Sequence, residues 1–242
     1  MQTLSFELLS LRSWIQSPTN SSPRQLTGAR TLLNFSAAFT PQKIPPTQSR
    51  RLSLNSILAV DLALQAAEHF PPDHIVFSSR FGEYNCSIDL ISSIHRGEDT
   101  SPMKFSHSVH NTALGMYAIL SGYHGSGLAM SDGGSSFVSG LRSCASYLVA
   151  NTDKTVMYVC SDAGLHPLSV NQRYRDWANA VAVACILRAS SDDDRHRIAL
   201  EVQTDPTQTS ETNQAREFLL SLFKEPGSTK RLEGRVSAKI LL

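Results

Sequence analysis

Residues 105–141 constrain the fold more than any other stretch of this sequence, and they read FSHSVHNTALGMYAILSGYHGSGLAMSDGGSSFVSGL. Their pattern predicts a helix over 105–120, a short buried strand over 127–130 and a second helix over 135–150. A tight turn at Gly133 and Gly134 leads into the second helix. Several enzyme folds hold a nucleophile in a turn of this kind. Because residues 131–135 (SDGGS) include no cysteine, the choice lies between a serine enzyme and an enzyme-like scaffold with an empty site.

Helical and strand-like segments alternate along the rest of the chain. Apolar residues at three- and four-residue spacing predict a helix over 51–70, which Pro71 and Pro72 end. Further helices are expected over 89–94 and 211–223, and short strands over 4–9, 74–79, 155–160, 178–188 and 197–203, the last two as a hairpin-like pair. This alternation predicts an α/β fold, a three-layer α-β-α architecture with a mixed sheet.

Two features refine this prediction. Residues 181–185 alternate Val or Cys with Ala, which is typical of a strand covered on both faces. The helix over 135–150 carries many small residues, so we expect it to pack closely at the centre of the fold.

Two segments show no clear element. Residues 17–50 are rich in polar residues and carry prolines at positions 18, 23, 41, 45 and 46. Since proline interrupts both helices and strand ladders, we expect a surface excursion here, within a single domain over 1–242. Residues 232–242 have little clear pattern.

Composition narrows the classes of partner. A net charge of +1 gives no basis for binding nucleic acid or an anionic membrane. The four cysteines are scattered without a CxxC pair, which is typical of buried free thiols. Neither a signal peptide nor an apolar run of about 18 residues is visible. We therefore expect a cytoplasmic protein with no metal and no cofactor.

Ser131 is the candidate nucleophile of a serine enzyme. Residues 129–133 (AMSDG) nearly match the G-x-S-x-G elbow, with a strand before and a helix after. The available acid–histidine pairs are Asp162 with His166, and one of residues 192–194 with His196. Each acid lies only two to four residues from its histidine, whereas a hydrolase places the two on separate loops. The sequence support for a Ser131 catalytic triad is therefore weaker than the near match to the elbow motif suggests.

His107 and His110 form a second candidate. Their i, i+3 spacing on a helix would suit a metal site or an acid–base pair. No cysteine or carboxylate accompanies them within a turn, which favours a capping or packing role.

Several motifs together carry a family resemblance. They are residues 76–83 (VFSSRFGE), 101–102 (SP) and 105–111 (FSHSVHN), followed by Gly115, Ile119, Gly122 and Gly125. Across 52–189 the chain resembles the N-terminal half of the β-ketoacyl synthases, and in particular short synthase-like proteins of bacterial aryl-polyene-type clusters. The resemblance implies a thiolase-like half-fold that lacks the C-terminal thiolase half.

The resemblance also implies that the catalytic position is empty. It places Gly134 where a ketosynthase carries its nucleophilic cysteine. Glycine has no side chain and cannot form the acyl thioester that begins a Claisen condensation. The two histidines that assist decarboxylation belong to the missing half. No residue is therefore expected to be catalytic, and the chain is expected to be inactive alone.

Among synthase relatives, a subunit without its cysteine acts as a chain-length factor beside a catalytic ketosynthase. The resemblance then implies a heterodimer that shapes the acyl-chain tunnel in polyene or fatty-acid-type biosynthesis, with an acyl carrier protein as a transient partner. The implied interface and tunnel residues are Met103, Lys104, Phe105, Ser106, His107, Ser108, Gly127, Leu128, Ala129, Met130 and Ser131. The alternatives are a stand-alone serine acyltransferase or hydrolase that uses Ser131, and a scaffold that never touches substrate.

Overall fold

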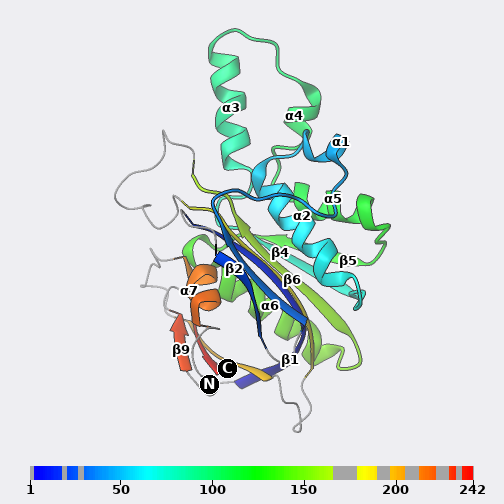
Figure 1. Cartoon of the computed structure of the whole chain (residues 1–242), viewed down its shortest axis with the longest axis vertical. Helices are drawn as coiled ribbons and strands as arrows, with labels where there is room; N and C mark the ends of the chain where they lie inside the picture. Colours follow the sequence, from blue (N-terminus) through cyan, green and yellow to red (C-terminus); the bar gives the residue numbers. More distant parts are fainter. Residues whose placement is uncertain are drawn as a thin grey trace.

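The computed structural model describes residues 3–17, 21–26, 30–165, 179–189, 197–204, 213–221, 229–232 and 236–241 (Figure 1). The helices are α1 (Pro46–Ser49), α2 (Leu54–Ala67), α3 (Tyr84–His95), α4 (Pro102–Ser106), α5 (Thr112–Ser121), α6 (Ser136–Ala150) and α7 (Gln214–Ser221), with a 3-10 turn η1 (Gly133–Ser135). The strands are β1 (Thr3–Gln16), β2 (Ser21–Leu26), β3 (Arg30–Ser36), β4 (His74–Ser78), β5 (Ser126–Met130), β6 (Thr155–Asp162), β7 (Val181–Ala189), β8 (Arg197–Thr204), β9 (Thr229–Leu232) and β10 (Val236–Leu241).

All the strands belong to one mixed sheet, as the sequence predicts. Its order is β5-β4-β6-β7-β1-β8-β10-β9, with β3 also paired to β1 and β2 to β3. β4 runs parallel to β5 and β6, whereas β7 is antiparallel to β6 and β1. Within the described residues β5 pairs with β4 alone, so β5 is an edge strand.

Helices cover both faces of the sheet, which confirms the three layers. One apolar cluster joins α6 and α7 to the sheet, and the other joins α2 and α5 to the opposite face. β7 contributes side chains to both clusters: Val183 and Cys185 pack in the first, and Ala182 and Ala184 pack in the second. The predicted two-sided burial of this strand is confirmed.

The close packing expected of α6 is also confirmed. A methyl group added at Gly140 would lie 2.4 Å from the ring of Tyr158 on β6. Gly140 is therefore a point where the helix approaches the sheet more closely than any side chain allows.

The helix predicted over 105–120 is wrong in its first half. α4 ends at Ser106 and α5 begins at Thr112, with a turn between them. Side chains hold this turn: the Thr112 hydroxyl donates to the Val109 carbonyl at 2.7 Å, and His107 and His110 bond to carbonyls of distant segments. These tertiary bonds outweigh a helical apolar pattern.

The surface excursion predicted over 17–50 is wrong in part, because the segment holds β2 and β3. β3 pairs in parallel with the second half of β1, from Ser10↔Arg30 to Gln16↔Ser36, and no proline interrupts it. Pro23 lies in β2, which pairs only with β3 among the described strands and shifts register between Ser21 and Arg24. An edge strand with a bulge is where a sheet tolerates proline.

The predicted hairpin of β7 and β8 is also wrong. β1 lies between them, pairing with β7 on one side and through Thr3–Glu7 with β8 on the other. β10 then pairs with β8, so the tail without a clear pattern contains a strand.

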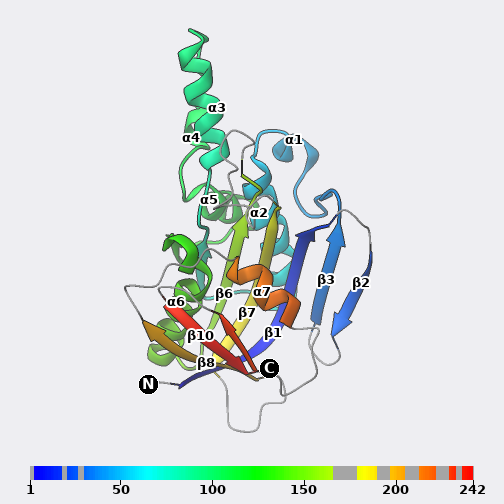
Figure 2. The ribbon, with the colours of Figure 1, turned by 90° about the vertical axis from the view of Figure 1, so that its left-hand side faces the viewer.

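α3 projects from the sheet at the top of Figures 1 and 2, with α4 beside it. Leu90 is its one buried residue. Within the described ranges, every helix is too short or too polar to span a lipid bilayer.

Candidate functional site

The carboxyl ends of β4, β5 and β6 meet at one edge of the sheet, because these three strands run parallel. Ser78 is in register with Met130 on one side and Cys160 on the other. The turns that follow these strands therefore lie side by side. Open α/β sheets place their functional groups at this edge.

Asp162, at the end of β6, holds the turn that follows β4. Its Oδ1 accepts the Ser79 hydroxyl at 2.7 Å and the backbone N–H groups of Arg80 and Phe81 at 2.9 and 3.1 Å. Burial raises the pKa of Asp162 to about 6, against these hydrogen bonds, which lower it. The Asp162 carboxyl group therefore has a structural role, because the hydroxyl and backbone N–H groups of the turn after β4 already donate to it.

The turn after β5 is different, since its centre has no side chain. Gly133 has a φ of +53°, and a methyl group added there would meet nothing within 4 Å. Asp132 anchors the turn to α6, because its Oδ2 accepts the Ser139 hydroxyl at 2.6 Å. Ser135 is 1% exposed, so its hydroxyl does not face an incoming substrate. The two central positions of this turn, Gly133 and Gly134, therefore present no side chain.

Ser131 lies exposed directly after β5, and its hydrogen bond goes to a backbone carbonyl and not to a base among the described residues. Its hydroxyl donates to the carbonyl of Arg80 at 3.2 Å. The imidazole in this neighbourhood belongs to His110, whose Nε2 donates to the carbonyl of Met130 at 2.9 Å. A nucleophilic serine needs a base that accepts its proton. Of the predicted acids and histidines, only Asp162 lies within the described residues, and it is held by the turn after β4.

The structure does not place His107 and His110 on one helix face. They lie in the turn between α4 and α5, and His107 Nδ1 donates to the carbonyl of Arg51 at 3.2 Å. In the described part of the chain, no group of three or more His, Cys, Asp or Glu side chains is arranged to hold a metal ion. The pair therefore ties the turn to Arg51, just before α2, and to Met130 at the end of β5.

The predicted interface residues fall into two neighbouring regions. Met103, Lys104, Phe105 and Ser106 belong to α4, His107 and Ser108 to the turn after it, Gly127, Leu128, Ala129 and Met130 to β5, and Ser131 to the residue that follows. α5 contacts β5 and separates the two regions along the chain. Their role in an interface stays a prediction.

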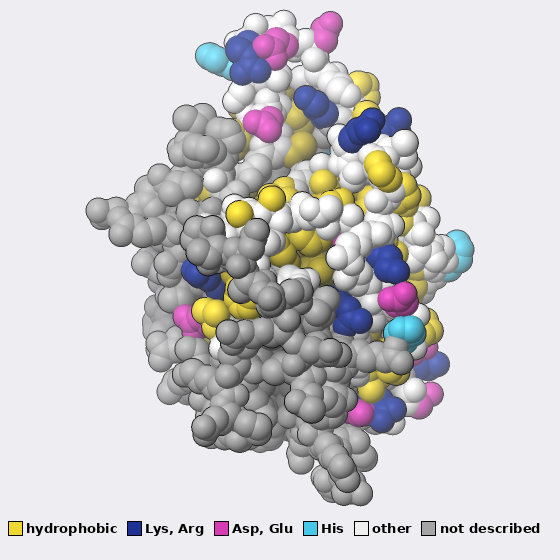
Figure 3. Space-filling model, in the orientation of Figure 1, with side chains coloured by type: hydrophobic (Ala, Val, Ile, Leu, Met, Phe, Trp, Pro, Cys, Tyr) yellow, Lys and Arg dark blue, Asp and Glu magenta, His cyan; other side chains and the backbone are white. Residues whose placement is uncertain are grey.

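These regions carry apolar side chains that face solvent. Phe105 is 69% exposed, Ile119 72% and Leu128 41%. Figure 3 shows hydrophobic side chains along the right-hand edge of the view, on the side where Figure 1 places α5 and β5. An unpaired strand edge beside exposed apolar residues is the kind of surface that a partner covers.

Sequence reasoning gave no role to Glu83, which the structure places behind this surface. Glu83 is 5% exposed and accepts the Ser56 hydroxyl at 2.6 Å. Burial raises its pKa. Its partners come from α2 and from the turn after α4, so the motif over 76–83 contains Glu83 without indicating its burial.

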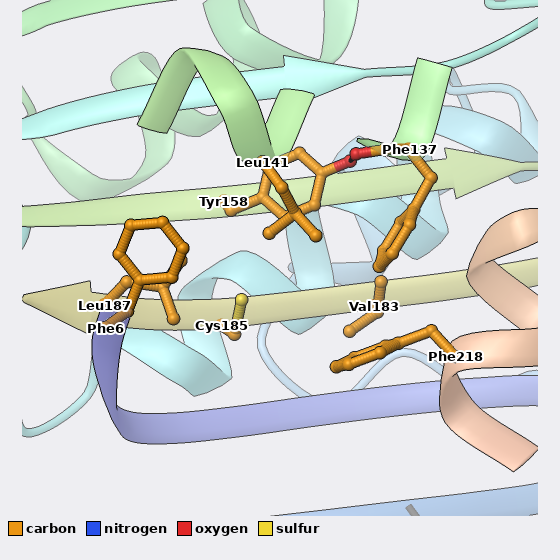
Figure 4. Close-up of a pocket in the computed structure, with 8 residues that line it drawn as sticks. All are labelled: Phe6, Phe137, Leu141, Tyr158, Val183, Cys185, Leu187 and Phe218. Atoms are coloured by element: carbon orange, nitrogen blue, oxygen red, sulfur yellow. Dashed lines mark hydrogen bonds between the residues drawn. The ribbon is translucent and has the colours of Figure 1, made fainter. Parts of the chain in front are cut away.

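An apolar cavity of about 10 Å³ lies between α6, α7 and the sheet (Figure 4). Its walls are Phe6, Phe137, Leu141, Tyr158, Val183, Cys185, Leu187 and Phe218. The volume holds about one water-sized sphere, far less than an acyl chain needs. It is a packing gap on the opposite face from α2 and α5.

Comparison with solved structures finds the same fold in ketosynthases. The complex of the ketosynthase ApeO with its chain length factor ApeC from Xenorhabdus doucetiae matches at 21% identity and a TM-score of 0.77, over 99% of this chain and 100% of that chain. The ishigamide ketosynthase/chain length factor matches at 14% and 0.55, over 70% of this chain and 54% of that chain. AntDE:AntF, an acyl-carrier protein in complex with its ketosynthase, matches at 13% and 0.56, over 91% and 74%.

These matches show an α/β fold of the thiolase-like ketosynthase type, as predicted. Among curated proteins, comparison finds no match. The family model described as beta-ketoacyl synthase, N-terminal domain, matches residues 16–229. Since that range covers most of the 242 residues, the chain belongs to the family of β-ketoacyl synthase N-terminal domains.

Proposed function

We propose that this chain is a ketosynthase-like subunit without condensing activity, and that it pairs with a catalytic β-ketoacyl synthase as its chain length factor. One observation carries the proposal: a turn with glycine at its centre directly follows β5, whose outer edge is unpaired among the described residues. The pathway would be of the polyene or fatty-acid type.

The chemistry of condensation supports an inactive role. Condensation begins when a thiolate takes an acyl group from its carrier, and the side chain at position 134 is a hydrogen atom. The neighbouring serines do not substitute, because Ser135 is buried and Ser131 donates to a carbonyl. The catalytic thiol would belong to the partner.

The geometry of β5 supports the pairing. A second edge strand can extend the sheet by adding antiparallel to β5, which satisfies the backbone groups of both chains. Leu128, Phe105 and Ile119 would then lie in the interface with the partner. An obligate interface of this kind buries more than about 2,000 Å².

Two of the matched structures support the choice of partner. One is described as a ketosynthase with its chain length factor, and another as an acyl-carrier protein with its ketosynthase. We extend both relationships to this chain: a lasting contact with a ketosynthase and a transient one with an acyl carrier protein.

The test is co-expression of the tagged chain with the ketosynthase encoded nearest to it, followed by affinity purification and sizing. A 1:1 heterodimer is expected. Leu128→Asp, which puts a charge on β5, should lower recovery of the ketosynthase at least about tenfold. Val149→Asp is the matched control, since Val149 is 62% exposed on the last turn of α6. A chain that stays monomeric and never recovers the ketosynthase would refute the proposal.

A further inference from the structure

Three exposed cations gather beside α4, at the border of the surface on which the ketosynthase would dock. Arg50 and Arg51 follow α1, and Lys104 lies in α4. The two segments are in contact, because His107, just after α4, donates from Nδ1 to the carbonyl of Arg51 at 3.2 Å. Figure 3 shows Lys and Arg side chains together at the upper right, where Figure 1 places α1 and α4. We call Arg50, Arg51 and Lys104 the basic rim.

The charges of the basic rim are not neutralised within the described part of the chain. Other surface cations form ion pairs there: Lys43 with Glu68, Arg96 with Glu98, Lys154 with Asp73 and Arg188 with Glu7. The side chains of Arg50, Arg51 and Lys104 form no such pair with any described residue. The rim is therefore a locally electropositive surface on a chain whose net charge is only +1.

The positive charge is confined to this small area. Asp89 on α3, and Glu98 and Asp99 just beyond it, are exposed acids on the helix that contacts α4. They disfavour a long polyanion such as a nucleic acid, or an anionic membrane, because both need a broad basic surface. A protein surface with a few carboxylates matches the size and the sign of the rim.

The rim borders exposed apolar side chains, which is the usual arrangement of a protein–protein interface. Phe105 follows Lys104 in α4 and is 69% exposed, and Leu128 on β5 is 41% exposed. Stable interfaces have an apolar centre, and the charged groups lie around it in contact with water. Charges at the edge of an interface act mainly on the rate of association and on the choice of partner.

We infer that the basic rim meets carboxylates on the ketosynthase, increases the rate at which the two chains associate, and so favours this partner over a protein without those carboxylates. This inference rests on the proposed function. The rim is assigned to the ketosynthase because it shares α4 with the surface of the lasting contact. A transient acyl carrier protein would have to bind outside that surface.

The expected effect is moderate, because salt limits the reach of the rim. At physiological ionic strength the screening length is about 8 Å, so the cations act on carboxylates that are already close to contact. Removing two of them should slow association about fivefold. Since the His107 bond uses the backbone carbonyl of Arg51, a substitution there leaves the turn after α4 in place.

The test is a competition for the ketosynthase during co-expression. The wild-type chain and Arg51→Gln/Lys104→Gln carry different tags, and the ketosynthase is kept in limiting amount. Mass spectrometry of the purified ketosynthase gives the ratio of the two bound chains, which is divided by their ratio in the soluble extract to correct for folding yield. About five wild-type chains are expected for each variant chain.

Two control variants separate charge from structure. Arg51→Lys/Lys104→Arg keeps both charges and should compete equally with the wild type. Arg142→Gln/Arg188→Gln removes two charges outside the rim, because Arg142 is exposed on α6 and Arg188 lies on β7, three strands from β5. It should also compete equally.

The outcomes distinguish this inference from the proposed function. If the ketosynthase recovers the wild type and Arg51→Gln/Lys104→Gln equally, the role of the rim is overturned and the proposed function stands. The same holds if Arg51→Lys/Lys104→Arg loses the competition as strongly, since charge is then not the cause. A variant that binds the ketosynthase normally but lowers recovery of the acyl carrier protein would assign the rim to the carrier and overturn the inference. If neither chain recovers the ketosynthase, the proposed function fails and this inference fails with it.

Discussion

Two adjacent turns at the same edge of the sheet are built in opposite ways. The turn after β4, residues 79–83, is fixed by Asp162, which accepts three hydrogen bonds, and it encloses the buried Glu83. The turn after β5, residues 131–135, has glycines at its centre and no reactive side chain. The difference teaches that neighbouring turns at one sheet edge can be held in different ways, one by a buried carboxyl group and the other by glycine and a bond to α6.

The largest effect is expected from Asp162→Ala. It leaves the Ser79 hydroxyl and two backbone N–H groups without their acceptor, which should cost about 3 kcal/mol or more of unfolding free energy. Asp162→Asn retains the acceptor oxygen and should cost less. Urea unfolding of the purified protein measures both. An alanine variant as stable as the wild type would show that the turn is not braced by this carboxyl group.

Comparison of the wild type with Asp162→Asn also predicts how the free energy of unfolding depends on pH. Because burial raises the pKa of Asp162 from 3.8 to about 6, its ionisation is penalised in the folded state. The stability of the wild type relative to Asp162→Asn should fall as the pH rises from about 4 to above 6, by about 2 to 3 kcal/mol in all. A difference that grows in the opposite direction would contradict the assignment.

The next largest effect is expected on the free energy of unfolding when one glycine from each turn is replaced by alanine. Gly82 and Gly133 have φ angles of +54° and +53°, so alanine is strained equally at both. Only at Gly82 does the new methyl group collide, at 2.4 Å from His110 Nδ1. Gly82→Ala should therefore destabilise the protein by about 2 kcal/mol more than Gly133→Ala in the same urea titration. Equal losses would mean that the two turns are packed alike.

The smallest effect is expected at Ser131. Ser131→Ala removes one exposed hydrogen bond to Arg80, which should change the unfolding free energy by less than about 0.5 kcal/mol and leave the complex intact. A fluorophosphonate probe should leave the wild type unlabelled. Labelling that disappears in Ser131→Ala would favour a serine acyltransferase or hydrolase.

The sequence predicts local elements well and their partners poorly. The strand over 74–79 and the helix over 51–70 carry their own periodicity and appear as β4 and α2. The pairing of β1 with β3, and its insertion between β7 and β8, depend on contacts between distant residues. No periodicity encodes such choices.

The features of the candidate site also fall into those that the sequence predicts and those that depend on distant contacts. The Gly-Gly turn and the missing cysteine are visible in the sequence, because they need only residue identity and local order. The helix break at residues 107–111 is not, since His107 and His110 bond Arg51 and Met130. Glu83 ends the 76–83 motif, but its burial has no local signal, because the groups that surround it arrive from two other elements.

The most direct test of the central claim is whole-protein mass spectrometry of the co-purified pair after exposure to an acyl thioester. The account predicts that the ketosynthase gains the mass of one acyl group and that this chain gains none. An acyl adduct on this chain that is stable enough to map to residues 131–135 would contradict it.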